Sequence, residues 1–140
     1  MYTPHTVTLF IASEGNTGTE YNSVVLHGVF LDLNKRSNIN RSGLSDADSA
    51  TLFIPFSIVT DKEYLTPKEY AREPDKSGYW TIFDGGDESG ADCFFVKGEI
   101  NGLYSYAEAR EQLDYVYHVT SVDLRDFGSA RMQHWMVGGR

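Results

Sequence analysis

The chain has 140 residues, a length typical of one domain, and its 41% hydrophobic and 23% charged residues are ordinary for a globular protein. The net charge is −8, which argues against a free-standing DNA-binding domain, because such a domain needs a concentration of Lys and Arg. A lone cysteine, Cys93, excludes an internal disulfide framework. Signal-peptide and membrane-spanning patterns are missing, so we expect one soluble domain, residues 1–140, inside the cell that makes it.

The first part of the chain predicts two strands joined by a turn. Residues 5–12 read HTVTLFIA and residues 24–33 read VVLHGVFLDL. Both are rich in β-branched residues and nearly alternate, as strands do. Residues 13–22 contain Gly15, Asn16 and Gly18 and predict a turn or loop. Gly28, inside the second strand, suggests a bulge or a close backbone approach.

A polar loop, a third strand and a short helix follow. Residues 34–49 are long for a connection in a compact domain, and such loops are usually functional or disordered. Residues 51–57 read TLFIPFS and predict a strand, in which Pro55 indicates an edge position or a bulge. Residues 66–69 read TPKE, a capping box with Pro at the first helical position. This pattern predicts a helix through about Arg72.

The middle of the chain predicts a hairpin with an acidic tip. Residues 79–83 (YWTIF) and 93–97 (CFFVK) have the composition of strands. Residues 84–92 between them read DGGDESGAD. The acids and glycines are not spaced as in an EF-hand calcium loop. We therefore expect a solvated loop tip, with weak cation binding as the alternative.

The last part predicts a helix and two strands. Residues 105–108 read SYAE, a second capping box that opens a helix through about Leu113. Residues 115–124 alternate as a strand, residues 125–130 form a turn, and residues 132–137 are the last strand. In total we count about seven short strands and two short helices, without a βαβ rhythm. The prediction is a mainly β (β-rich α+β) fold: a small antiparallel barrel or sandwich with two peripheral helices and long loops.

Candidate catalytic residues are few and scattered. Cys93 with His118 or His134, and Asp123, could supply a nucleophile, a base and an orienting acid, but no local sequence signature surrounds them. The histidines and the cysteine lack metal-ligand spacing, and no glycine-rich segment has a phosphate-loop pattern. We expect no catalytic residues, no cofactor and no metal ion. Paired carboxylates of a hydrolase stay open, because separation in sequence says little about separation in space.

Several segments resemble one family of viral proteins. They are SGLSDADSATLFIPFS (42–57), DKSGYWTIF (75–83) and VDLRDFGSARMQHWMVGGR (122–140), with VVLHGVFLD (24–32) and FFVKGEI (94–100) in the same order. Together they span nearly the whole chain. They resemble small minor capsid proteins encoded in the head–tail joining cluster of tailed phages and prophages of Gram-positive bacteria. The closing strand, which contains His134 and Trp135, is similar to that of head-closure (stopper) and connector proteins.

The resemblance implies a structural virion protein without a membrane partner. Identical subunits would form a ring at the phage neck, between the portal-side adaptor and the tail terminator or tube, after a period in the host cytoplasm. Genomic DNA would pass through the lumen, and acidic side chains there would repel its phosphates. The candidate lumen residues are Asp84, Asp87, Glu88 and Asp92. The candidate contacts with a neighbouring subunit or ring are Lys35, Arg36, Arg41 and Trp135.

Two other functions fit the same sequence. A phage accessory protein, such as a defence inhibitor, would bind a small molecule or a host factor and predicts a closed oligomer with a polar pocket. A small hydrolase predicts that Cys93, His118 and His134 cluster in space. For the loops at 34–49 and 84–92, plain disorder is the alternative to a functional role.

Overall fold

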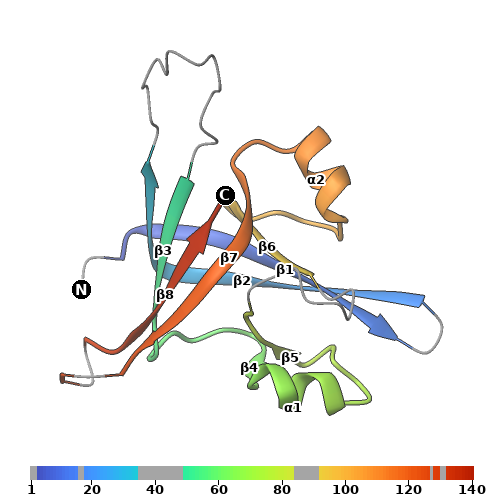
Figure 1. The fold of residues 1–140 in the computed structure, drawn as a ribbon, viewed down its shortest axis with the longest axis horizontal. Coiled ribbons are helices and arrows are strands. Elements are labelled where there is room, and N and C mark those ends of the chain that lie inside the picture. The colour runs from blue at the N-terminus through green and yellow to red at the C-terminus, as the bar shows by residue number, and fades with distance from the viewer. Residues whose placement is uncertain (1–2, 16–17, 35–48, 84–91, 127, 130–131) are drawn as a thin grey trace.

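The computed structural model describes residues 3–15, 18–34, 49–83, 92–126, 128–129 and 132–140. Six strands close into a barrel in the order β1-β2-β3-β8-β7-β6 (Figure 1), and every neighbouring pair is antiparallel. This confirms the predicted β-rich fold and selects the barrel over the sandwich. The barrel strands are β1 (His5–Gly15), β2 (Gly18–Asn34), β3 (Ser49–Pro55), β6 (Asp92–Lys97), β7 (Val116–Arg125) and β8 (His134–Gly139).

The first two strands form a longer hairpin than the sequence indicates. Their pairing runs without a break from Thr6 of β1 to Gly15, which pairs with Gly18. The loop expected over residues 13–22 is therefore wrong. The polar residues there read as a loop by composition, but each strand supplies the backbone hydrogen-bond partners of the other, and this cross-strand pairing outweighs the local preference.

The bulge expected at Gly28 is confirmed. His5 pairs with Val29 and Thr6 pairs with His27, which leaves Gly28 as an extra residue in β2. Its φ of +86° lies in the left-handed region, which glycine adopts without a steric penalty. The bulge bends the hairpin where β2 turns from β1 towards β3.

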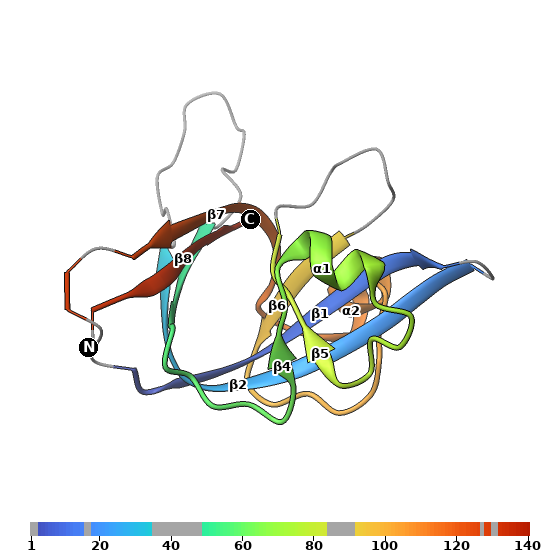
Figure 2. The same ribbon diagram turned by 90° about the horizontal axis from the view of Figure 1, so that it is seen from below.

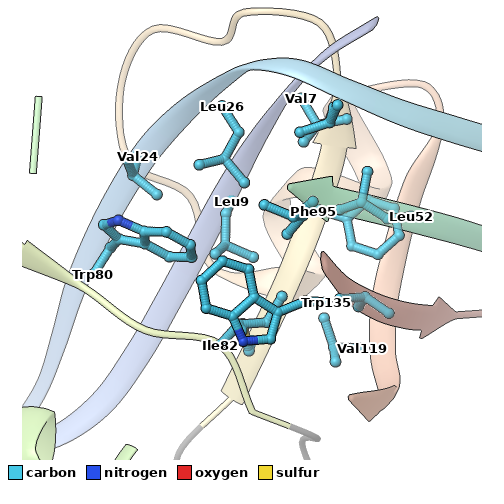
Figure 3. Close-up of a cluster of buried hydrophobic side chains, with 14 of the residues drawn as sticks. Val7, Leu9, Val24, Leu26, Leu52, Trp80, Ile82, Phe95, Val119 and Trp135 are labelled. Atoms are coloured by element: carbon cyan, nitrogen blue, oxygen red, sulfur yellow. The ribbon is translucent and has the colours of Figure 1, made fainter. Parts of the chain in front are cut away.

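The core fills the inside of the barrel with alternate residues of each strand. Buried and partly buried positions alternate strictly along β3 and β8. Trp80 and Trp135 meet in this core with their ring centroids 5.8 Å apart, surrounded by aliphatic side chains (Figure 3). Each fully buried large side chain stabilises the fold by about 1.5–3 kcal/mol. Further core residues are Val7, Leu9, Leu26, Leu52, Ile54, Phe95, Val119 and Val137.

The connection from β3 to β6 enters the barrel core. It carries β4 (Glu63–Tyr64), α1 (Pro67–Arg72) and β5 (Tyr79–Trp80), and Figure 2 shows them together on one side of the barrel. The expected hairpin of residues 79–83 with 93–97 is wrong, because β5 pairs in parallel with β4 while β6 pairs with β1 and β7. Trp80, Thr81 and Ile82 are all buried, so this stretch is enclosed on every side and does not form one face of a hairpin.

The connection from β6 to β7 stays outside the barrel. Its helix α2 (Tyr106–Gln112) buries Ala109 in a second, smaller apolar cluster on the outer wall. Phe10 and Phe94 stack there with centroids 4.9 Å apart. Figures 1 and 2 place α1 and α2 on opposite sides of the strands. Both helices begin at the predicted capping boxes.

In the part of the chain that the structure describes, no helix combines the length and apolar character needed to cross a membrane.

Candidate interaction site

A two-stranded ribbon projects from the barrel. β6 pairs with β1 over Val7–Ala12, and β3 pairs with β2 over Phe30–Asn34. Residues 13–15 and 18–21 therefore have only each other as strand partners among the described residues, and we call them the β1–β2 ribbon. Figure 1 shows it extending past the other strands. At its base the ribbon contacts the connection that carries α1, where Glu20 lies 3.9 Å from Lys76.

Asn22 anchors the base of the ribbon to the connection on the barrel side. Its Nδ2 donates to the carbonyls of Lys76 and Tyr79, both at 2.8 Å, and to the Tyr70 hydroxyl at 3.2 Å. Its Oδ1 accepts from Lys62 Nζ at 2.5 Å, and the same ammonium donates to the Ser23 carbonyl at 2.7 Å. One amide side chain thus fixes both the ribbon base and the segment that fills the core.

Burial shifts the pKa values of two side chains at the base of the ribbon, Lys62 and Tyr70. Desolvation lowers the pKa of Lys62, partly offset by Asp61. Desolvation also raises the pKa of Tyr70, while its hydrogen bond from Asn22 acts in the opposite direction. These shifts follow from burial in a structural network, and the oxygen acceptors around Lys62 Nζ hold its protonated form in place.

A groove runs between α2 and β7. Its volume is about 700 Å³, and a smaller recess of about 390 Å³ shares Thr120 and Arg140 with it. We call the larger space the α2–β7 groove. Arg110 and Arg140 line it as exposed cations, and Asp114 is the one acid among its described lining residues. The other lining side chains are Tyr106, Leu113, Tyr115, Val116, Tyr117, His118 and Thr120.

Two backbone irregularities border this groove. Tyr115 is the one non-glycine residue with positive φ in the described part of the chain, at +58°. It opens the turn into β7 and is 46% exposed, with Lys97 Nζ 5.2 Å from its ring centroid. Strained residues of this kind cluster at binding and switch sites. The second irregularity is a bulge at Thr120, where the β7–β8 register shifts between Val119 and Ser121.

Gly138 and Gly139 of β8 lie beside the Thr120 bulge, where the neighbouring side chains leave no room for a Cβ. A Cβ at Gly138 would lie 2.5 Å from Ser121 Oγ, and a Cβ at Gly139 would lie 2.7 Å from the Phe95 ring. Larger residues would therefore displace β7 from β8 or push into the core. The result is a shallow surface with aromatic and arginine walls and exposed hydroxyls.

Most of the predicted site residues lie outside the described residues. Asp84, Asp87 and Glu88 do so, as do Lys35, Arg36 and Arg41. The backbone of Asp92 begins β6, opposite Ala12 of β1.

Trp135 lies in the core, which corrects its expected place at a subunit interface. Its side chain is 7% exposed and packs against Phe56, Tyr64 and Trp80, with centroids 4.6, 4.8 and 5.8 Å away. Strand alternation turns Trp135 inward and its neighbour His134 outward. Little of the indole is left for another subunit to contact.

The three residues of the hydrolase hypothesis face different surroundings. Cys93 is fully buried in the barrel core, whereas His118 lies on the outer wall, 5.0 Å from the Tyr106 ring. His134 stacks on Phe53, 5.5 Å away, at the start of β8. The barrel wall thus separates the Cys93 thiol from both imidazoles. No group of three His, Cys, Asp or Glu side chains suited to a metal ion occurs among the described residues.

The groove was not predicted, although its parts have sequence signals. The run YVYH at residues 115–118 places aromatic and imidazole groups on one strand, and GGR ends the given chain. What brings these together is the β7–β8 pairing, in which His118 and Arg140 exchange backbone hydrogen bonds of 3.0 and 2.9 Å. No local sequence pattern predicts that pairing.

These features define a small closed antiparallel β-barrel protein with a projecting ribbon and a groove flanked by a helix. A family model matches residues 2–140, so the chain belongs to DUF6751, a family of unknown function. No curated protein and no solved structure matches the chain.

Proposed function

We propose that this protein is a non-enzymatic structural subunit of the phage neck, forming a ring between the portal-side adaptor and the tail. The observation that carries the proposal is the β1–β2 ribbon, whose strand pairing continues past the barrel to Gly15 and Gly18. A ribbon without further strand partners fits a protein that completes its fold against another subunit. The resemblance of the sequence to head–tail joining proteins supports the same role.

The acidic segment is the proposed lumen face. Asp92 begins β6 opposite Ala12, where the β1–β2 ribbon starts, and Asp84, Asp87 and Glu88 precede it in the sequence. Four carboxylates within nine residues would repel DNA phosphates and let the genome slide. In the ring, these carboxylates would line the channel, and Lys35, Arg36 and Arg41 would contact a neighbouring subunit or ring.

The decisive experiment images particles with and without the gene. We expect a density ring at the neck of wild-type particles. In the deletion strain we expect DNA loss or unjoined heads and tails, with recovery when the gene is supplied in trans. Normal, DNA-filled, tailed particles from the deletion strain would defeat the proposal.

The lumen assignment has its own test. Replacing Asp84, Asp87, Glu88 and Asp92 by Lys adds attraction for phosphate where the proposal requires repulsion. DNA retention or ejection should be impaired, while Asn or Gln at the same positions should have a milder effect. Unchanged infectivity of the Lys variant would remove the lumen assignment and leave the neck role intact.

A second function is favoured by the α2–β7 groove. Its volume of about 700 Å³ is typical of small-molecule sites, and it joins arginine, histidine and tyrosine side chains. An accessory protein that captures a small molecule or a host factor would use such a surface. Such a protein would remain a small closed oligomer in solution and would be missing from purified particles. Mass spectrometry of purified virions tests whether it is present.

A further inference from the structure

We propose that the α2–β7 groove and the recess beside it bind a nucleoside monophosphate, with the phosphate where the two spaces join and the base in the groove. The inference rests on the second of the two functions above, which gives the groove a small-molecule role, and it does not depend on the neck role. The groove has a volume of about 700 Å³, and it shares Thr120 and Arg140 with the recess of about 390 Å³. Spaces of this size are typical of small-molecule sites.

One wall of the groove carries two arginines that a series of contacts connects. His118 and Arg140 exchange backbone hydrogen bonds of 3.0 and 2.9 Å, so their side chains leave the same face of the paired strands. The His118 ring lies 5.0 Å from the Tyr106 ring. Arg110 donates to the Tyr106 hydroxyl at 3.1 Å, and its guanidinium lies 5.7 Å from that ring. Both arginines are thus part of one wall.

This wall is cationic in a protein with an excess of acids. The chain has 12 Lys and Arg against 20 Asp and Glu, yet Arg110 and Arg140 share the groove with one acid, Asp114, among its described lining residues. Within the described part of the chain, the only ion pair joins Lys76 to Glu20. No described carboxylate therefore neutralises either arginine. Two such guanidinium groups, each a planar fork of donors, favour an anionic ligand.

The recess favours a phosphate over a carboxylate. Arg140 lines it together with three hydroxyl side chains, those of Ser49, Thr51 and Thr120. Ser49 and Thr51 are partly exposed and alternate with a buried residue along β3, so their side chains point out of the barrel. Each hydroxyl can donate one hydrogen bond. Three hydroxyls and a guanidinium match the several oxygens of a phosphate better than the two oxygens of a carboxylate.

The other end of the groove supplies an apolar wall with an exposed ring. Leu113, Tyr115 and Val116 line it, and Tyr115 is 46% exposed. A strand rises about 3.3 Å per residue, so Val116 and Thr120 are separated by about 13 Å along β7. This separation suits a ligand in which a sugar holds a charged group apart from a flat base. The base can pack against Tyr115 while the phosphate binds near Thr120.

Calorimetric titration of the purified protein tests the ligand class. The probes are AMP, GMP, CMP and UMP, with the corresponding nucleosides and inorganic phosphate as the two parts of each ligand. We expect at least one monophosphate to bind tenfold or more tightly than its nucleoside and than inorganic phosphate. Absence of binding by all four, or a nucleoside that binds as tightly as its monophosphate, would overturn the inference. Tighter binding of a single-stranded oligonucleotide would assign the arginines to a nucleic acid and would also overturn it.

Arginine variants test the place of the phosphate. Arg140→Ala should weaken binding of the monophosphate by about tenfold or more, and Arg110→Ala by a smaller factor, because Arg140 borders both spaces. Arg72→Ala is the matched control, since Arg72 lies in the last turn of α1 as Arg110 lies in that of α2, and Arg72 does not line the groove. Circular dichroism shows whether each variant is folded. An equal loss for Arg72→Ala, or full affinity in both groove variants, would contradict the proposal.

The variant Tyr115→Gly tests the place of the base. Tyr115 has a φ of +58°, which glycine adopts without strain, so the variant removes the ring and keeps the backbone. Binding of the monophosphate should weaken several-fold, whereas the affinity for ribose 5-phosphate should stay unchanged. Equal changes for the two ligands would overturn the placement of the base.

The outcomes separate this inference from the neck role. Failure of every monophosphate to bind would defeat the proposed ligand and leave the neck role as it stands. Normal, DNA-filled, tailed particles after deletion of the gene would defeat the neck role, whereas the titrations with purified protein would still decide whether the groove binds its ligand.

Discussion

Two connections in this protein begin their helices in the same way and end in opposite places. Both α1 and α2 start with a complete capping box, at Thr66 and Ser105. The segment around α1 contributes Trp80 to the inside of the barrel, whereas α2 lays Ala109 against its outer wall. The capping motif therefore decides where a helix starts, but not on which side of the barrel wall the neighbouring side chains pack.

The largest loss of stability is expected for Trp80→Ala, which removes the main side chain that the inner connection contributes to the core. Trp80 is 2% exposed and meets Tyr64 and Trp135. Its truncation should lower the free energy of unfolding by about 3–5 kcal/mol. Urea denaturation measures this, with Val59→Ala as the control because Val59 is 87% exposed. A change no larger than that of the control would mean that the inner connection is not part of the core.

A smaller loss is expected for Asn22→Ala. The variant removes the donor to Tyr70, Lys76 and Tyr79 and leaves Lys62 Nζ with one acceptor fewer. We expect about 2 kcal/mol of destabilisation, because partly buried polar groups lose their partners. Hydrogen exchange should show faster opening of residues 60–80 while α2 keeps its protection. Equal acceleration in both connections would contradict the role of Asn22 as an anchor of the inner one.

Loss of either capping box should lower the free energy of unfolding by a similar amount, and each loss should affect its own helix. Thr66→Ala and Ser105→Ala each remove one cap and should each cost about 1 kcal/mol. Since the sites share no partner, the double variant should be additive within about 0.5 kcal/mol. Amide exchange should rise in the helix that lost its cap. Strong non-additivity would show that the two connections are coupled through the barrel wall.

The smallest effect is expected at alkaline pH. Burial raises the pKa of Tyr64 and Tyr70 above the usual value of 10.0, so the folded state favours their protonated forms. This contribution is present below about pH 10 and is lost as the pH rises further. The lowered pKa of Lys62 acts with the opposite sign, favouring the fold as the pH rises towards 10.5. Tyr70→Phe should flatten the alkaline loss in a thermal unfolding series; a loss as steep as in wild type would point to other groups.

Local patterns in the sequence anticipate the parts of the fold that local physics controls. Both capping boxes, the bulge at Gly28 and the strands with clear alternation are confirmed, because dihedral preferences and orphan helix amides act within a few residues. The projection of the ribbon was missed because polar residues 13–22 read as a loop. The stretch YWTIF was misplaced because composition does not distinguish a hairpin strand from a segment enclosed by a barrel.

The sequence by itself determined a mainly β chain with two capped helices and a net charge of −8. Only the tertiary structure decided that six strands close, that Trp135 points inward, and that Arg110, His118 and Arg140 share one groove. The physical reason is the distance along the chain over which each interaction acts. Capping and alternation act between near neighbours, whereas barrel closure and groove formation depend on which distant strands pair, and that is set by the summed packing of the whole core.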